Sequence, residues 1–385
     1  MAPTDPLPAS LPRGLRYLIT AACVLALAAA LPRSLVGREA GALFDGDAAA
    51  QGALARAVAA DVLRDTGAAA FHTGSTRFDG EWALVTSQMS ALGLSQVILA
   101  HPAQRARYLP PLRLAVDHIL RPQTFAFATQ AWGVSPLDHL DDERGHAYLG
   151  YVALALGALR AVDPATPHAA LHDRLVASLA RRLERSASGA LETYPGESYP
   201  CDLATVVGAI GQHARLTGAD RRALLSRMSA VYRARWINPS TGYLAQTVDP
   251  ATGAPSSPGR GSGTALSSYF LSFADPSLAR ALGVSVARTG ARTLAGFGAV
   301  LEYAPGTSGH GDIDSGPVVL GVSVSATGFA LASARQLGDR GRFVALYRTA
   351  DLFGVPVARG DGRAFLAGGP IGNAILLAML TARPP

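Results

Sequence analysis

The sequence predicts an all-α protein: an (α/α)6 barrel, which is a closed ring of six helical hairpins, preceded by one N-terminal transmembrane or signal segment. Three observations predict it. Six segments consist almost wholly of small and apolar residues, as expected for helices buried on all sides. More charged segments of helical period lie between them. The apolar segments also recur every 52 to 63 residues, and internal repetition of this kind is the signature of a repeated supersecondary unit.

The first 40 residues are predicted to be a targeting or anchoring segment. The run from Leu15 to Leu31 is apolar apart from Arg16 and is close to the shortest length that spans a membrane. A cleaved signal peptide would use the small residues Ala28 to Ala30 as its exit. An uncleaved anchor is slightly favoured, because no polar break separates the apolar run from that exit. Either alternative predicts an exported or inner-membrane-anchored protein whose globular domain lies outside the cytoplasm.

Residues 41–385 are predicted to form the toroid as one domain. Hydrophobic residues make up 49% and charged residues 16% of the chain, which supports a large core and excludes disorder. The formal charge is +6, but every basic residue is an arginine, and the arginines occur singly or in pairs without interleaved aromatic residues. This pattern argues against a nucleic-acid partner. A homo-oligomer is compatible with the sequence.

The expected inner helices each follow a polar loop rich in glycine or proline. They are predicted to begin at Glu81, Arg144, Asp202, Thr264, Gly316 and Pro370. A first helix is expected over Asp47–Asp65, and amphipathic outer helices over His168–Arg185, Ala219–Trp236, Pro276–Leu294 and Arg340–Phe353. The β-branched run Val318–Val324 is assigned to an inner helix rather than a strand, because of its small residues and the length of the whole segment.

Ionisable residues cluster at four of the loop-to-inner-helix junctions, which should meet at one end of the ring. The candidate catalytic residues are Asp79, Glu81, His146, Glu192, Cys201, Asp312 and Asp314. The candidate substrate-binding residues are Trp82, Asp142, Tyr199, Asp202, Tyr243 and His310. Helix capping is the alternative for Asp79, Asp202 and Asp314, and a satisfied core position is the alternative for His146. Capping does not explain why so many such residues gather in short stretches.

Two carboxylates that face one cavity can act as acid and base when their environments separate their pKa values. Cys201 is the only cysteine outside the N-terminal segment, where Cys23 lies, and it is either a reactive thiol or a small buried side chain. The sequence has no metal-ligand spacing, phosphate-binding loop or dinucleotide fingerprint, so neither a metal nor a cofactor is expected.

The motifs FDGEW, ETYPGESYPCD and GDIDSGP, with a histidine-bearing inner helix after an acidic loop, resemble the linalool dehydratase/isomerase domain family over roughly Leu54 to Thr381. The resemblance implies a cofactor-independent enzyme of the hydro-lyase and isomerase type that acts on a terpenoid-like alcohol in an apolar pocket. His146 would be the family's histidine, Cys201 its second cysteine, and Asp79 or Glu81 its early acid. The family's first cysteine has no counterpart here, and Glu192 stands near its place.

Three functions are therefore considered. The first is a lyase or isomerase of an apolar, small-molecule alcohol, in which an acid or the Cys201 thiol protonates the leaving hydroxyl. The second is a glycoside hydrolase-like carbohydrate enzyme in which Asp312 or Asp314 pairs with Glu81, Asp142 or Glu192. The third is a non-catalytic envelope scaffold whose junction acids only cap helices.

Overall fold

The computed structural model describes residues 12–65, 67–141 and 144–383. Six helices form the inner ring, and each contacts the next until the last one returns to the first. Their bounds are α4 (Thr76–Ala100), α7 (Leu149–Val162), α9 (Pro200–Thr217), α11 (Gly261–Leu271), α13 (Val324–Gln336) and α15 (Gly369–Leu380). The closed ring confirms the predicted (α/α)6 barrel.

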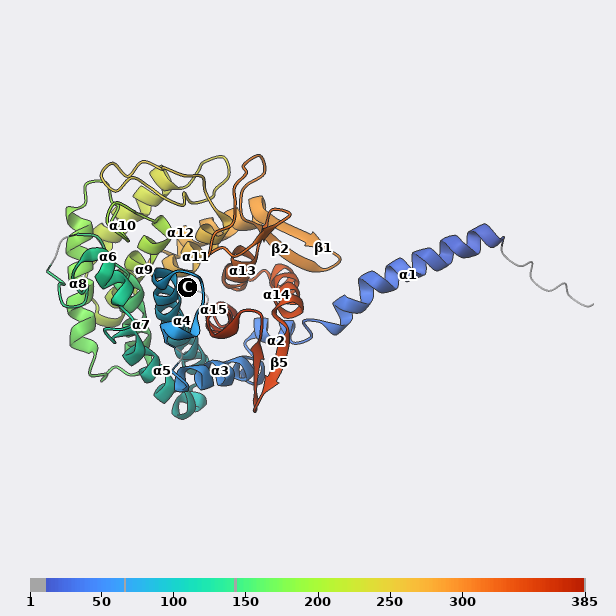
Figure 1. Cartoon of the computed structure of the whole chain (residues 1–385), viewed down its shortest axis with the longest axis horizontal. Coiled ribbons are helices and arrows are strands. Elements are labelled where there is room, and N and C mark those ends of the chain that lie inside the picture. The colour runs from blue at the N-terminus through green and yellow to red at the C-terminus, as the bar shows by residue number, and fades with distance from the viewer. Residues whose placement is uncertain (1–11, 66, 142–143, 384–385) are drawn as a thin grey trace, which may run out of the picture.

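An outer layer of amphipathic helices surrounds this ring (Figure 1). Its members are α5 (Arg105–Ile119), α8 (Ala169–Arg185), α10 (Arg222–Val231), α12 (Pro276–Ser285), α14 (Arg340–Gly354) and α3 (Ala48–Leu63). Helix α3 packs on α15 and α4, so the first outer helix of the chain closes the hairpin of the last inner helix. Shorter helices are α2 (Ala40–Asp45) and α6 (Ala126–Trp132), with 3-10 turns at Ala68–Ala70 and Pro102–Gln104 and π-helical turns at Tyr232–Trp236 and Val286–Gly290.

Short strands occupy two of the connections. The four-stranded antiparallel sheet has the order β1-β2-β4-β3, and a separate hairpin pairs β5 with β6. Their bounds are β1 (Ala291–Leu294), β2 (Phe297–Leu301), β3 (Val318–Val319), β4 (Val322–Ser323), β5 (Pro356–Arg359) and β6 (Gly362–Phe365).

Two sequence predictions are wrong at these strands. The helix expected from Gly316 begins only at Val324, because Leu320 and Gly321 adopt positive φ angles and turn the chain into the β3–β4 hairpin. The outer helix expected over Pro276–Leu294 ends in strand β1, which pairs in register with β2. In both segments, pairing with a neighbouring strand satisfies the backbone and overrides the local helical pattern.

Helix α4 is the one described helix long and apolar enough to cross a membrane by length and composition. Most of its apolar window, 78%, is buried inside the barrel, so α4 is a core helix. The N-terminal helix α1 (Arg13–Leu35) is different, because it projects away from the body (Figure 1).

Glycines allow the inner helices to approach closely. A Cβ atom at Gly208 of α9 would lie 2.4 Å from the carbonyl oxygen of Phe270 in α11. A Cβ at Gly150 of α7 would lie 2.7 Å from the backbone nitrogen of Val206 in α9. Because these obstacles are backbone atoms, a side chain could be accommodated only by moving whole helices apart.

Gly208→Ala is therefore expected to destabilise the protein by about 2 to 3 kcal/mol, since overpacking a rigid core costs energy of this order. Gly328→Ala is the matched control: it is also an inner-helix glycine, but a Cβ there would meet nothing within 4 Å. The control should be neutral or more stable by up to about 1 kcal/mol, from helix propensity alone. Urea unfolding of the two variants tests this. Equal destabilisation by both would contradict the tight packing.

Candidate functional site

The N-terminal ends of the inner helices bring together three carboxyl groups. Glu81 lies in the second turn of α4, Asp202 in the first turn of α9, and Asp314 in the loop before the β3–β4 hairpin. Burial is the largest influence that raises the pKa of Glu81, and the charges of Asp314 and Asp202 add to it, so the three carboxyl groups lie within electrostatic reach of one another. We call Glu81, Asp202 and Asp314 the acid group.

Glu81 forms the floor of the acid group. Its side chain is only 5% exposed, and its Oε1 accepts a short hydrogen bond from the Tyr194 hydroxyl. Burial is the largest influence on this carboxyl group and raises its pKa to about 7; the bond from Tyr194 opposes that rise. Glu81 is therefore a carboxylic acid that still holds a proton near neutral pH.

Asp202 is half-buried beside it and is held by hydroxyl groups. It accepts hydrogen bonds from Tyr151 (Oη–Oδ1 2.7 Å) and from Thr193 (Oγ1–Oδ2 3.0 Å). The Cys201 thiol lies 3.9 Å from Oδ1. Burial raises the pKa of Asp202, and the three donors oppose that rise because each favours the ionised form.

Asp314 stands at the solvent side of the group, where its residue is exposed. Desolvation of its carboxyl group by the surrounding protein, followed by the charges of Asp312 and Asp202, raises its pKa to about 6. A hydrogen bond from Trp82 partly offsets this rise. The acid group thus combines a buried, protonated acid, Glu81, with a carboxylate in contact with water, Asp314.

An ion-pair network, buried at Arg260 and Glu302 and partly exposed at Asp312, fixes the loop that carries Asp314. Arg260, the residue before α11, binds Glu302 (Nε–Oε1 2.6 Å) and also pairs with Asp312. Asp312 and Ser315 close the loop through reciprocal bonds of 2.9 and 2.8 Å. Burial alone would raise the pKa of Asp312, but the bond from Arg260 outweighs it and the pKa is lowered. Asp312 is therefore an ionised structural partner of Arg260.

Three tyrosines that the sequence analysis did not select surround Glu81 and Asp202. Tyr148 stacks on Tyr151 with ring centroids 5.1 Å apart and tilts against Tyr194 at 5.8 Å. Arg77 lies over the outer face of the Tyr194 ring at 4.4 Å. The sequence signal was present, because these tyrosines lie in the same HAYLGY and ETYPG segments as the selected acids.

The structure places several predicted residues around the acid group. Cys201 and Trp82 contact Asp202 and Asp314 respectively, as described. Tyr199 is half-buried, and its hydroxyl donates to Glu197 (2.8 Å). Burial raises the pKa of the Cys201 thiol well above its usual range, so the thiol stays protonated and is a poor nucleophile.

His146 lies behind the group rather than in it. It is fully buried, and its Nε2 bonds the Thr193 hydroxyl at 3.1 Å. Since that hydroxyl donates onward to Asp202, we assign the His146 proton to Nε2. Burial lowers the pKa of His146 to about 3, so the ring is neutral and acts by orienting Thr193.

The remaining predicted residues have other partners. Asp79 receives the Thr73 amide and hydroxyl at 2.9 and 2.8 Å, and these bonds lower its pKa. Glu192 accepts the Gly196 amide and closes a turn. Tyr243 is fully buried and donates to the Leu301 carbonyl at 3.0 Å. His310 is exposed, and Asp142 lies outside the described residues.

One histidine-containing group has donor atoms close enough for a metal, in the part of the chain that the structure describes. The ligand atoms of His172, Asp173 and His213 lie within 4.8 Å of one another. Asp173 already accepts a hydrogen bond from His213 (2.8 Å) and pairs with Arg160 at 2.5 Å. This group lies on α8 and α9, outside the acid group. The expected absence of a metal or cofactor stays a prediction.

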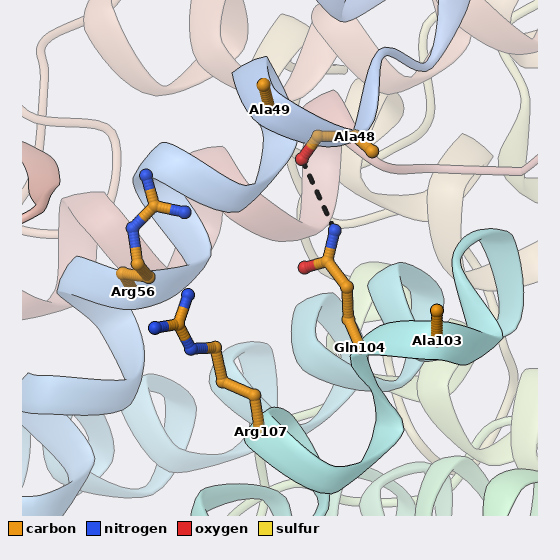
Figure 2. Close-up of a pocket in the computed structure, with 6 residues that line it drawn as sticks. All are labelled: Ala48, Ala49, Arg56, Ala103, Gln104 and Arg107. Carbon is orange, nitrogen blue, oxygen red and sulfur yellow. Dashed lines mark hydrogen bonds between the residues drawn. The ribbon is translucent and has the colours of Figure 1, made fainter.

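A surface cavity of about 340 Å³ also lies elsewhere. Figure 2 shows it between α3 and α5, with Arg56 and Arg107 on one side and Gln104 bonded to the Ala48 carbonyl on the other. Both arginines lie within 3.5 Å of Asp361, which offsets their charge. The cavity therefore shares no residue with the acid group.

The fold and the acid group define an (α/α)6 barrel with clustered carboxyl groups at one end. A solved structure of similar fold is an inactive variant of an α-1,6-mannanase from Salegentibacter sp. HEL1_6 in complex with α-1,6-mannotriose. It has a TM-score of 0.50 and 11% identity, and the match covers 78% of this chain and 90% of that one. A structure of the α-1,6-mannanase from the same organism has a TM-score of 0.49 and 12% identity, with the same coverage. No family model and no curated protein matches the chain.

These findings correct the functional expectation from sequence. A solved structure of similar fold is an α-1,6-mannanase, so the resemblance to the linalool dehydratase/isomerase family was wrong, and so was the lyase or isomerase acting on an apolar alcohol. The geometry agrees with the correction. A site floored by Glu81 and Asp202 and surrounded by hydroxyl groups is polar where the expected pocket was apolar.

Proposed function

We propose that this protein is a carbohydrate enzyme of the glycoside hydrolase type, which cleaves glycosidic bonds in an oligosaccharide. The observation that carries the proposal is the acid group, in which a buried Glu81 with a pKa of about 7 lies near two further carboxyl groups. Glycosidic bond hydrolysis needs one protonated and one ionised carboxyl group on either side of the bond. The acid group supplies both forms near pH 6 to 7.

Each acid has a distinct part in the proposed reaction. Glu81 donates its proton to the glycosidic oxygen as the bond breaks. Asp314, ionised above a pKa of about 6 and open to water, attacks the anomeric carbon or activates a water molecule. Asp202, held by Tyr151 and Thr193, stabilises the positive charge that develops on the sugar. Because the three groups are coupled, their protons belong to the group as a whole.

The surrounding side chains suit a sugar. Trp82 and Tyr199 are half-buried aromatic residues, a type of side chain that packs on the apolar face of a pyranose. The hydroxyls of Tyr194, Tyr148 and Thr193 offer hydrogen-bond partners around the acids. The mannanase of similar fold was solved with a mannotriose, which makes α-linked mannooligosaccharides the first substrates to test.

The similar structure suggests a second placement of the active site. That structure is of an inactive variant in which asparagine replaces aspartate at two consecutive positions. This chain has one candidate pair, Asp141 and Asp142. The Asp141 side chain is fully exposed and lies 3.5 Å from Arg181, whereas Asp142 is outside the described residues. The proposal therefore rests on the acid group, and Asp141→Asn tests the alternative.

The proposed activity is tested with the full chain in detergent and a panel of α-1,6-, α-1,2- and α-1,3-linked mannooligosaccharides and glucans. We expect new reducing ends from at least one member between pH 5 and pH 8, with shorter oligosaccharides in the mass spectrum. A folded protein that cleaves no member contradicts the proposal. Loss of cleavage in Asp141→Asn but not in acid-group variants would move the active site to the 141–142 loop.

We also propose that the barrel lies outside the cytoplasm and that helix α1 carries it there. Support comes from the apolar composition of α1 and from its exposed position away from the body (Figure 1). Polysaccharides are substrates met outside the cytoplasm, so this placement agrees with the proposed activity. Protease protection of spheroplasts tests it, since an external barrel is degraded by added protease. The predicted homo-oligomer stays a prediction.

A further inference from the structure

Helix α1 is fixed to the body without a flexible linker. Only four residues, Val36 to Glu39, separate it from α2. Within them, the Gly37 amide donates to the Asp351 carboxylate of α14 at 2.7 Å in a buried bond. Gly37 has a φ of +68°, and a Cβ there would lie 2.6 Å from Cγ of Arg348. Any longer side chain would disrupt this junction, so the end of α1 has a defined place on α14.

Two further contacts surround this junction. The carbonyl of Gly296, in the β1–β2 turn, accepts a bond from Arg348 at 3.4 Å. A Cβ at Gly296 would lie 2.7 Å from the Arg33 side chain, in the last turn of α1. Figure 1 shows α1 leaving the body on the side where α2, α14 and the β1–β2 hairpin lie. Any surface or bilayer that surrounds α1 therefore lies next to these elements.

The elements around the exit of α1 carry exposed apolar side chains. Leu294, next to the β1–β2 turn, is 83% exposed, and Phe353, at the end of α14, is 71% exposed. Val355, which follows α14, is 50% exposed. Large apolar side chains gathered on one side of a body mark an interaction surface more often than scattered ones do. We call Leu294, Phe353 and Val355 the exit face.

Near the exit face, the charged side chains that have no ion-pair partner among the described residues are arginines. Arg33 and Arg292 are exposed, and the described residues place no carboxylate within ion-pair distance of either. The nearby acids are internal partners instead, because Arg363 pairs with both Glu39 and Asp351. Unpaired arginines beside exposed apolar residues match a surface of anionic phospholipid headgroups.

We propose that the exit face lies in the headgroup region of the same bilayer that holds α1, so that the barrel rests on the membrane in one orientation. This inference rests on the proposed membrane anchoring and not on the proposed activity. The apolar run Leu15–Leu31 within α1 spans about 25 Å as a helix, close to the shortest length that crosses a hydrocarbon core of about 30 Å, and Arg33 follows it at the level of the headgroups. Because α1 ends at the body without slack, the exit face meets the headgroups where α1 emerges.

The test uses the full chain in vesicles of phosphatidylcholine and phosphatidylglycerol. Roughly one lipid in four is the anionic phosphatidylglycerol. An environment-sensitive fluorophore is attached to single cysteines in a Cys201→Ser background. Native Cys23 reports on α1. Leu294→Cys and Phe353→Cys, each combined with Cys23→Ser, report on the exit face. Leu216→Cys in the same combination is the control, because Leu216 is exposed at the end of α9, which packs against α8 and α10.

We expect a lipid-borne quencher to reduce the fluorescence at positions 23, 294 and 353 by about twofold or more, and to leave position 216 unchanged. If position 23 is quenched while 294 and 353 behave like 216, the exit face does not touch the bilayer and the inference is overturned. If position 23 is also unquenched, the anchoring fails and the inference fails with it. Thermal melts confirm folding, and turnover of a soluble oligosaccharide by the wild-type chain in the same vesicles reports separately on the proposed activity.

Discussion

Glu81→Gln is expected to reduce kcat on the cleaved oligosaccharide by at least about 100-fold, because a positioned general acid contributes 10²- to 10⁴-fold to such reactions. The amide has nearly the same shape and can still accept the Tyr194 hydrogen bond, so the fold should persist. Steady-state kinetics across pH 5 to pH 8 measures the loss. Glu184→Gln, on the outer helix α8, is the matched control and should leave kcat unchanged.

The same variant has a second expected result that does not depend on the substrate. Burial raises the pKa of Glu81 from 4.5 to about 7, so the folded state binds this proton more tightly than the unfolded state does. The free energy of unfolding of the wild type therefore falls as pH rises from about 4.5 to about 7, and then levels off. A shift of this size corresponds to about 3 kcal/mol.

Glu81→Gln removes that titration. The variant should thus gain stability relative to the wild type as the pH is raised, with little change in the difference below pH 4.5 or above pH 8. Urea unfolding at pH 4.5, 6 and 8 measures it. A constant difference across this range would show that the Glu81 carboxyl group is not held protonated, and the acid assignment would fall even if the variant were inactive.

Arg260→Gln is expected to destabilise the protein by about 3 to 5 kcal/mol, because it leaves a buried carboxylate without its cation. Glu302 is fully buried and would keep only the Ser262 hydroxyl as a side-chain partner (2.6 Å). The substitution also releases Asp312 and loosens the loop that carries Asp314. Urea unfolding measures the stability, and kcat should fall as Asp314 loses its fixed position.

A second substitution separates lost charge pairing from lost packing. Arg260→Gln combined with Glu302→Gln should recover part of the stability, because the unpaired buried charge is gone. Arg222→Gln is the matched control, since that arginine pairs with Asp220 on the surface and its loss should be undetectable. If the double variant is no more stable than Arg260→Gln, the network contributes through packing and not through charge compensation.

The acid group shows how far a motif can be interpreted from sequence. Asp79 and Glu81 both lie in FDGEW. On an α-helix, side chains two positions apart differ in direction by about 200°. The sequence does not state the rotation of α4, so it cannot say which of the two faces inward. The structure turns Glu81 into the barrel and leaves Asp79 to bind Thr73 in the preceding loop.

The tyrosines and the β3–β4 hairpin were missed for related reasons. Tyr148, Tyr151 and Tyr194 look like ordinary core residues in sequence, and only contact with the acids of other helices gives them a role. The small residues in the run Val318–Val324 and the length of the whole segment favoured a helix, although its β-branched residues also suit a strand. Pairing of Ser323 with Val300 in the neighbouring β2 strand decides it.

The sequence by itself determined the ring of buried helices, the amphipathic layer outside it and the end of the ring where the acids gather. These follow from the periodicity of apolar residues and from their regular recurrence, which are local properties of the chain. Only the tertiary structure decided which carboxyl groups meet, which pKa values shift and where α1 leaves the body. Burial and through-space charge come from residues far apart in sequence, and they exist only after the ring has closed.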